Sequence, residues 1–156
     1  MSELFIISTK ACSITGHRAV DKDFDVKRLK DIFLKLIEVG IDTFLIGMAV
    51  GFDTLCFQLL EEIREEKQIK IIACIPCLNQ AERFSFSQKR EYERMCQVAD
   101  YKVVLSEKYT PTCMQRRNEY MVNNSCVLVS YLRRQASGTG KTVRFAEKKG
   151  IKVIRM

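Results

Sequence analysis

The sequence predicts an α/β domain built as a three-layer αβα sandwich, with helices on both faces of a mostly parallel β-sheet. Two observations support this fold class. Short apolar segments rich in β-branched residues recur along the chain, and segments with helical periodicity separate them. The 156 residues also match the usual size of one domain, without an internal repeat or a Pro/Gly-rich linker. We therefore expect residues 1–156 to form a single domain.

The predicted strands are residues 11–15, 43–46, 69–75, 101–105, 126–131 and 151–154. Apolar residues at i, i+3 and i+4 spacing predict helices over 26–37 and 52–63, and similar patterns predict helices over 82–98, 113–122 and 141–149. Gly150 follows the last helix, where a left-handed glycine commonly forms the cap. Residues 4–8 fit either an edge strand or an ordered arm.

The formal net charge of +7 and the pI near 9.1 favour anionic partners, because Lys and Arg attract phosphates and nucleic acids. The basic residues are scattered, which also fits an ordinary solvated surface. The apolar run near the N-terminus falls far short of the ~20 residues that a membrane span needs, so we expect no membrane partner. The odd count of seven cysteines, most of them in apolar patterns, predicts reduced thiols and a cytoplasmic location.

Ligands of parallel sheets lie beyond the carboxyl ends of the strands, so the loops that follow the predicted strands are the candidate site. The first of these loops contains Gly16, His17 and Arg18. Gly16 permits a sharp turn, and the next two side chains then stand at the sheet edge. His17 is the only histidine, and it is either an ordinary polar loop residue or a ligand contact.

The second loop carries the candidate ligand-binding residues Gly47, Met48, Ala49, Gly51 and Asp53. Its G-x-x-x-G spacing differs from the dinucleotide fingerprint, but backbone N–H groups at a helix start favour an anion. Asp53 either caps the first turn or accepts hydrogen bonds from a ribose. It is also the candidate catalytic residue.

A third loop resembles a phosphate-binding Walker loop, but Gln135 stands where that motif requires its first glycine. Small residues, backbone donors, a hydroxyl and a lysine at a helix start still form a seat for an anion. The candidate residues of this loop are Ser137, Gly138, Thr139, Gly140, Lys141 and Thr142.

Two arginines complete the candidate site. Arg90 would add positive charge, and so would Arg117, which follows Arg116 on a predicted helix. Consecutive helical residues point about 100° apart, so at most one of this pair faces the pocket, and a solvated helix start is the alternative.

The pair Cys74 and Cys77 matches C-x-x-C, but Cys74 falls inside a predicted strand instead of opening a helix. Structural thiols are therefore favoured over redox chemistry. With one histidine and no second C-x-x-C, we expect no zinc or other metal, and nothing in the sequence indicates a cofactor.

Together the loops resemble a bacterial and phage branch of the SLOG superfamily over nearly the whole chain, from residue 11 to residue 154. The motifs that carry the resemblance are Thr15-Gly16-His17-Arg18, Gly47-Met48-Ala49-x-Gly51-x-Asp53, Ile75-Pro76-Cys77 with Gln80, Tyr109-Thr110 with Cys113-Met114 and Arg117-Asn118-x-Tyr120-Met121-Val122, and Gly138-Thr139 with Thr142-Val143. The resemblance implies a Rossmann-like fold with a small nucleotide-like ligand at these loops. Relatives often assemble as homodimers, which makes a homo-oligomer a further expectation, although no exposed apolar stripe demands one.

Members of this superfamily include cytokinin-activating nucleoside monophosphate phosphoribohydrolases and DNA-processing protein A, so three functions stay open. The first is binding, with sensing or processing, of a nucleotide or nucleotide-derived phosphorylated ligand. The second is an N-glycosidase, but the glutamate of the hydrolase motif falls at Arg144, so Asp53 or Glu82 would have to act. The third is a DNA-binding module that uses scattered Lys and Arg on phosphates.

Overall fold

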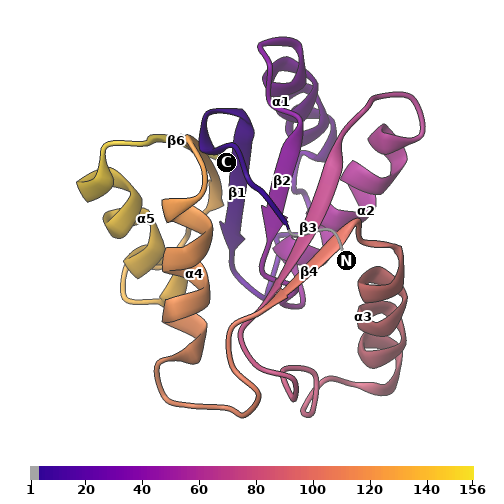
Figure 1. The fold of residues 1–156 in the computed structure, drawn as a ribbon, viewed down its shortest axis with the longest axis vertical. Helices are drawn as coiled ribbons and strands as arrows, with labels where there is room; N and C mark the ends of the chain where they lie inside the picture. Colours follow the sequence, from indigo (N-terminus) through magenta and orange to yellow (C-terminus); the bar gives the residue numbers. More distant parts are fainter. Residues whose placement is uncertain (1–3) are drawn as a thin grey trace.

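The computed structural model describes residues 4–156 and contains one six-stranded sheet with the order β4-β3-β2-β1-β5-β6 (Figure 1). Every neighbouring pair is parallel. The strands are β1 (Ala11–Gly16), β2 (Thr43–Ile46), β3 (Lys70–Ile75), β4 (Tyr101–Val104), β5 (Val127–Tyr131) and β6 (Lys152–Arg155). The predicted α/β class and the Rossmann-like arrangement are thus confirmed.

Helices cover both faces of the sheet (Figure 1). They are α1 (Val26–Glu38), α2 (Phe52–Arg64), α3 (Phe86–Val98), α4 (Cys113–Asn123) and α5 (Gly138–Lys149), and a short 3₁₀ helix, η1 (Ser8–Lys10), precedes β1. The largest core cluster joins α1, α2 and α3 to one face of the sheet. Two smaller clusters join α4 and α5 to the opposite face.

The sequence of each strand reflects its place in the sheet. The central strands β1, β2 and β5 are buried along almost their whole length, as expected for strands covered on both faces. The edge strands β4 and β6 mix exposed and half-buried residues. The continuous apolar runs of the sequence therefore mark the centre of the sheet.

Two helix starts differ from the sequence prediction, and the capping residues explain both. Helix α3 begins at Phe86 instead of residue 82, because Ser85 and Gln88 form a reciprocal capping box. Helix α5 begins at Gly138 instead of residue 141, because the Ser137 hydroxyl accepts from the Gly140 amide at 3.0 Å. At the other end of α5, Gly150 has φ 80°, which confirms the predicted left-handed cap.

Residues 4–7, which precede η1, form an ordered arm without strand structure. Leu4 and Ile6 pack against the cluster of Leu45, Ile72 and Met121, on the same face of the sheet as α4. No helix in residues 4–156 has both the length and the apolar character that a membrane crossing requires.

The strand order places a topological switch point beside β1. The chain runs from β1 through β2 and β3 to β4, and then returns to form β5 on the other side of β1. The loops that follow β1 and β5 therefore diverge to opposite faces and leave a crevice between them. This crevice is where the candidate site forms.

Gly51, the N-cap of α2, offers a test of how these loops pack. Its φ is +85°, and a Cβ there would lie 2.1 Å from the backbone oxygen of Arg18. We expect Gly51→Ala to lower the free energy of unfolding by roughly 1–3 kcal/mol or more, measured by urea denaturation. Gly138→Ala is the matched control, because that helical position is open and the change should stay within about 1 kcal/mol. Equal losses in both variants would contradict the packing of Arg18 on Gly51.

Candidate functional site

A cavity of about 630 Å³ lies at the carboxyl edge of the sheet, where the loops after β1 and β5 diverge. Its volume falls within the ~300–1,000 Å³ of typical small-molecule sites. The structure brings together nine of the sixteen residues proposed from the sequence, which line this cavity: Gly16, His17, Arg18, Ala49, Asp53, Arg117, Ser137, Gly138 and Thr139.

The other proposed residues lie outside this cavity lining. Met48 and Gly51 line a neighbouring cavity, and Gly47 lies against the guanidinium of Arg117. Arg90 lies over the ring of Phe86 on α3, at 5.8 Å.

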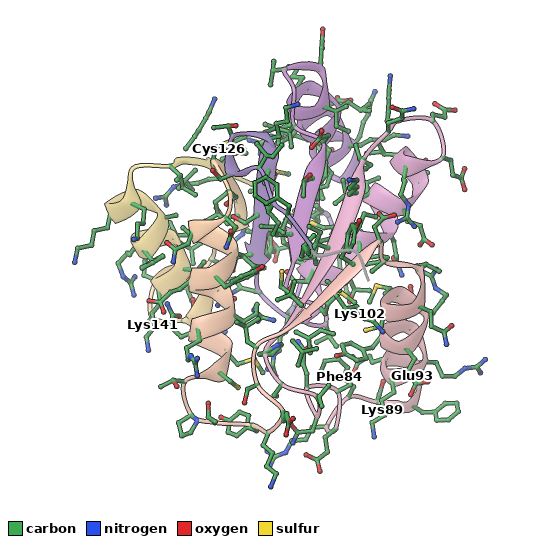
Figure 2. All side chains as sticks on the ribbon, viewed as in Figure 1. Phe84, Lys89, Glu93, Lys102, Cys126 and Lys141 are labelled. Atoms are coloured by element: carbon green, nitrogen blue, oxygen red, sulfur yellow. The ribbon has the colours of Figure 1, made fainter. Side chains whose placement is uncertain are left out.

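Three residues of α5 also stay outside the lining. The Gly140 amide is bound by Ser137, and Thr142 is buried and donates to the Gly138 oxygen at 2.9 Å. Lys141 is exposed on the outer side of α5 (Figure 2). Only the start of the third loop therefore borders the cavity.

His17 connects the loops after β1 and β5. Its Nε2 accepts from the backbone amides of Arg133, at 2.7 Å, and Arg134, at 3.1 Å. Only an unprotonated nitrogen can accept, so the ring is neutral and carries its proton on Nδ1. Burial, followed by the nearby charges of Arg134 and Arg133, lowers the pKa of His17 below its ordinary value.

The loop after β1 also packs on the start of α2. The Phe52 amide donates to the His17 oxygen at 3.1 Å. A Cβ on Gly16 would lie 2.3 Å from the Phe52 ring, so this turn has room only for glycine. The Phe52 ring in turn stacks on Tyr131, a wall residue of the cavity, with centroids 5.4 Å apart.

Asp53 is a buried carboxyl group at the cavity. Its Oδ2 accepts from the Ala49 amide at 3.1 Å, whereas Oδ1 is shielded from solvent and has no hydrogen-bond partner among residues 4–156. Burial raises the pKa of Asp53 to about 6, against the opposing effects of Arg117 and the Ala49 amide. A carboxyl group of this kind holds a proton more readily than an exposed aspartate does.

Arg117 is a buried cation whose hydrogen bonds go to neutral groups. Its Nε donates to Asn118 Oδ1 at 2.7 Å, and its Nη1 donates to the oxygens of Gly47 and Cys74. No ion pair within residues 4–156 involves Arg117, and burial lowers its pKa. Arg116 is exposed and borders no part of the cavity, so only one of these two consecutive arginines lines it.

The turn between β2 and α2 organises these groups. Met48 has φ 65°, an uncommon value for a residue other than glycine. The flanking Gly47 oxygen accepts from both Arg117 and Gln80 Nε2, and the flanking Ala49 amide reaches Asp53. Backbone strain of this kind is concentrated at functional sites.

The opening of the cavity is positively charged. Arg18 and Arg134 are exposed and form no ion pair within the described chain, whereas Arg133 pairs with Asp21 at 3.3 Å. The amides of Gly138 and Thr139, in the first turn of α5, have no hydrogen-bond partner in the described residues. Free amides at a helix start attract anions.

Sequence reasoning left several lining residues out of the candidate site, among them Gln80, Tyr131, Arg133 and Arg134. Arg133 and Arg134 are the second and third residues after β5, and Arg18 is the second residue after β1. Their place after a predicted strand was a signal that could have identified them. Glu82, the alternative acid, lines a neighbouring cavity.

The cysteines are free thiols. Cys74 and Cys77 are both buried, and burial raises the pKa of Cys74 to about 12, so its thiolate is disfavoured. Within residues 4–156 no group of three or more His, Cys, Asp or Glu side chains is arranged to hold a metal ion.

The titration of His17 tests the link between the loops. Because the unfolded chain binds this proton more readily, the stability that His17 contributes is complete above about pH 6.5 and is lost as the pH falls. We expect NMR to give a pKa below 6.5 for this single histidine. The difference in free energy of unfolding between the wild type and His17→Ala should shrink between pH 8 and pH 5.5. A pKa above 6.5 would contradict the hydrogen bonds to Nε2.

The sequence also matches known proteins. The YpsA family model, described as the YspA SLOG family, matches residues 13–150. The "Uncharacterized SPbeta prophage-derived protein YoqJ" of Bacillus subtilis (strain 168) is 31% identical over 141 residues, which cover 78% of this chain and 81% of that protein.

Two solved structures of DNA processing protein A share the fold, each with a TM-score of 0.70. The Streptococcus pneumoniae protein is 19% identical, and the match covers 94% of this chain and 50% of that one. The Helicobacter pylori protein is 16% identical, and the match covers 95% of this chain and 65% of that one. The chain therefore spans half to about two-thirds of these proteins. The family model and the prophage relative show that this chain belongs to the YspA SLOG family.

Proposed function

We propose that the protein binds a nucleotide or a nucleotide-derived phosphorylated ligand in the cavity at the carboxyl edge of the sheet. One observation carries this proposal: free backbone amides and arginines from separate loops converge on a single cavity of ligand size. The SLOG fold is compatible with a nucleotide-binding or DNA-binding module, and the cavity favours the former.

The start of α5 is the proposed phosphate seat. The amides of Gly138 and Thr139 offer two donors, and the helix dipole adds ~0.3–1 kcal/mol toward an anion. The guanidinium groups of Arg18 and Arg134 border the same space and can each bind phosphate oxygens in pairs. These donors come from two segments of the chain, the loop after β1 and the segment from Arg134 to Thr139, which the fold brings together.

The remaining wall suits the less charged part of a nucleotide. Phe84 and Met114 are half-buried and provide apolar and aromatic surface, and the Asn118 amide adds a polar group. Ile14 and Tyr131 support this wall from fully buried positions. A binding site of this composition holds a ring system by contact and orients it by a few hydrogen bonds.

A small ligand is favoured over nucleic acid because Arg18, Arg133 and Arg134 line a cavity of ligand size. The Helicobacter pylori DNA processing protein is described as binding single-stranded DNA. That protein shares the fold at 16% identity, and DNA binding is the competing hypothesis for this chain.

A comparison of nucleotides with nucleosides tests the phosphate seat. We expect one of the four ribonucleoside monophosphates to raise the melting temperature, with the matching nucleoside binding at least tenfold more weakly. A ligand at 100 times its Kd stabilises the fold by ~2.7 kcal/mol. Arg134→Gln should weaken nucleotide binding about tenfold, since its bonds to phosphate are charge-assisted.

Arg116→Gln is the matched control, because it removes the same charge from a side chain outside the cavity lining. Equal binding of nucleoside and nucleotide would contradict the phosphate seat. An equal loss in the Arg116 and Arg134 variants would assign the effect to net charge alone.

A second candidate is an N-glycosidase that uses Asp53 as its acid. The observation in its favour is a pKa of about 6, which suits proton transfer near neutrality. Arg144, at the position of the family glutamate, cannot do this work because it is a cation, and its Nη1 donates to the Gln135 oxygen at 3.0 Å.

An assay that measures by chromatography the release of free base from nucleoside monophosphates tests this second function. If Asp53 donates the proton, the rate should fall as the pH rises above about 6, because the carboxyl group then loses that proton. Asp53→Asn should lower the rate by roughly 10²-fold or more. The absence of turnover in the wild type across all four nucleotides would exclude the hydrolase and leave the binding function intact.

A further inference from the structure

A second cavity of about 600 Å³ adjoins the first at the carboxyl edge. The two cavities share the lining residues Arg18, Gln80, Phe84 and Met114. Both are open to solvent, so one ligand can extend from the first to the second over these side chains. Figure 2 shows Phe84 at this end of the molecule, near the start of α3.

The second cavity has the composition of a base-binding site with positive charge nearby. Tyr109, in the loop after β4, is 61% exposed and lines the cavity together with Phe84. Arg83 and the shared Arg18 supply guanidinium groups, and neither forms an ion pair within the described chain. Exposed aromatic rings beside arginines stack on nucleobases and bind the phosphates that flank them.

We propose that the ligand is a dinucleotide, with one nucleotide unit in each cavity and the phosphate linkage beside Arg18. This inference rests on the proposed function, since it places the first unit at the start of α5. The two cavities are similar in volume, and each matches the size of a small-molecule site. Arg18 borders both of them, which is the position that a linking phosphate requires.

The boundaries of the two cavities favour two units over a longer strand. The first cavity is bordered on one side by the loop after β5, at Arg133, Arg134 and Ser137. In the second, Glu82 contributes a carboxylate that repels a further phosphate. We therefore expect the two cavities to hold one phosphate linkage, and the Glu82 carboxylate to disfavour a second.

The test compares AMP, the 5′-phosphorylated diadenylate pApA and a 5′-phosphorylated oligoadenylate of ten residues, by calorimetry at one salt concentration. We expect pApA to bind at least tenfold more tightly than AMP, and the ten-residue strand to bind no more tightly than pApA. Tyr109→Ala should weaken pApA binding about tenfold, the effect of losing one stacked base, and leave AMP binding unchanged.

Two control variants lie close to the second cavity but outside its lining. Phe86→Ala removes an aromatic ring that is 78% exposed on α3, and Lys89→Gln removes a charge from the same helix. Both should bind pApA as the wild type does, whereas Arg83→Gln should weaken pApA severalfold. Equal losses in the Tyr109 and Phe86 variants would overturn the assignment of the second cavity.

The possible outcomes distinguish the dinucleotide proposal from the nucleotide-binding proposal on which it rests. Equal affinity for AMP and pApA would overturn the dinucleotide and leave nucleotide binding in place. Failure of every mononucleotide and of pApA to bind would overturn both. Affinity that rises with strand length and falls steeply with salt would identify a nucleic-acid strand as the ligand and reject the two-unit limit.

Discussion

The hydrogen bonds of the His17 ring hold together two loops that the sheet topology drives apart. The chain leaves β1 toward one face and β5 toward the other, so the crevice between them would be free to open without a connection. His17 Nε2 connects the two loops by accepting hydrogen bonds from two consecutive backbone amides after β5. The His17 carbonyl oxygen also accepts from the Phe52 amide at the start of α2. The cavity wall, the position of the arginines after β5 and the approach of α5 all depend on this small set of contacts.

The sequence predicted the strands and the order of the elements because a parallel sheet buried on both faces needs continuous apolar runs, and such runs are visible without a structure. Helix starts were harder to predict. Ser85 and Ser137 decide where α3 and α5 begin, through single side-chain bonds that the apolar pattern does not contain. The arm at Leu4 also stayed ambiguous, since packing on one face of the sheet is compatible with several backbone conformations.

The candidate site was partly predictable for the same reason. Position after a strand was enough to identify Gly16, Asp53 and Ser137, because parallel topology collects such residues at one edge. It was not enough to assign roles: Gly51 packs against the backbone of Arg18, and the His17 ring binds the protein itself. Gln80 and Phe84 come from an irregular loop whose path no periodicity describes. The positions of residues after the predicted strands therefore located the site, whereas the hydrogen-bond and packing partners of each residue became known only from the structure.

The bonds of Arg117 have a consequence for the acidity of the cavity. Arg117 belongs to α4, whereas Asp53 belongs to α2 on the other side of the sheet, and the guanidinium favours the ionised carboxylate. Because Gly47 and Cys74 hold that guanidinium at the ends of β2 and β3, its distance from Asp53 follows the placement of a whole helix. A displacement of α4 would therefore move the Arg117 guanidinium and change the pKa of Asp53. The position of this helix is thus coupled to the protonation of a carboxyl group in the cavity.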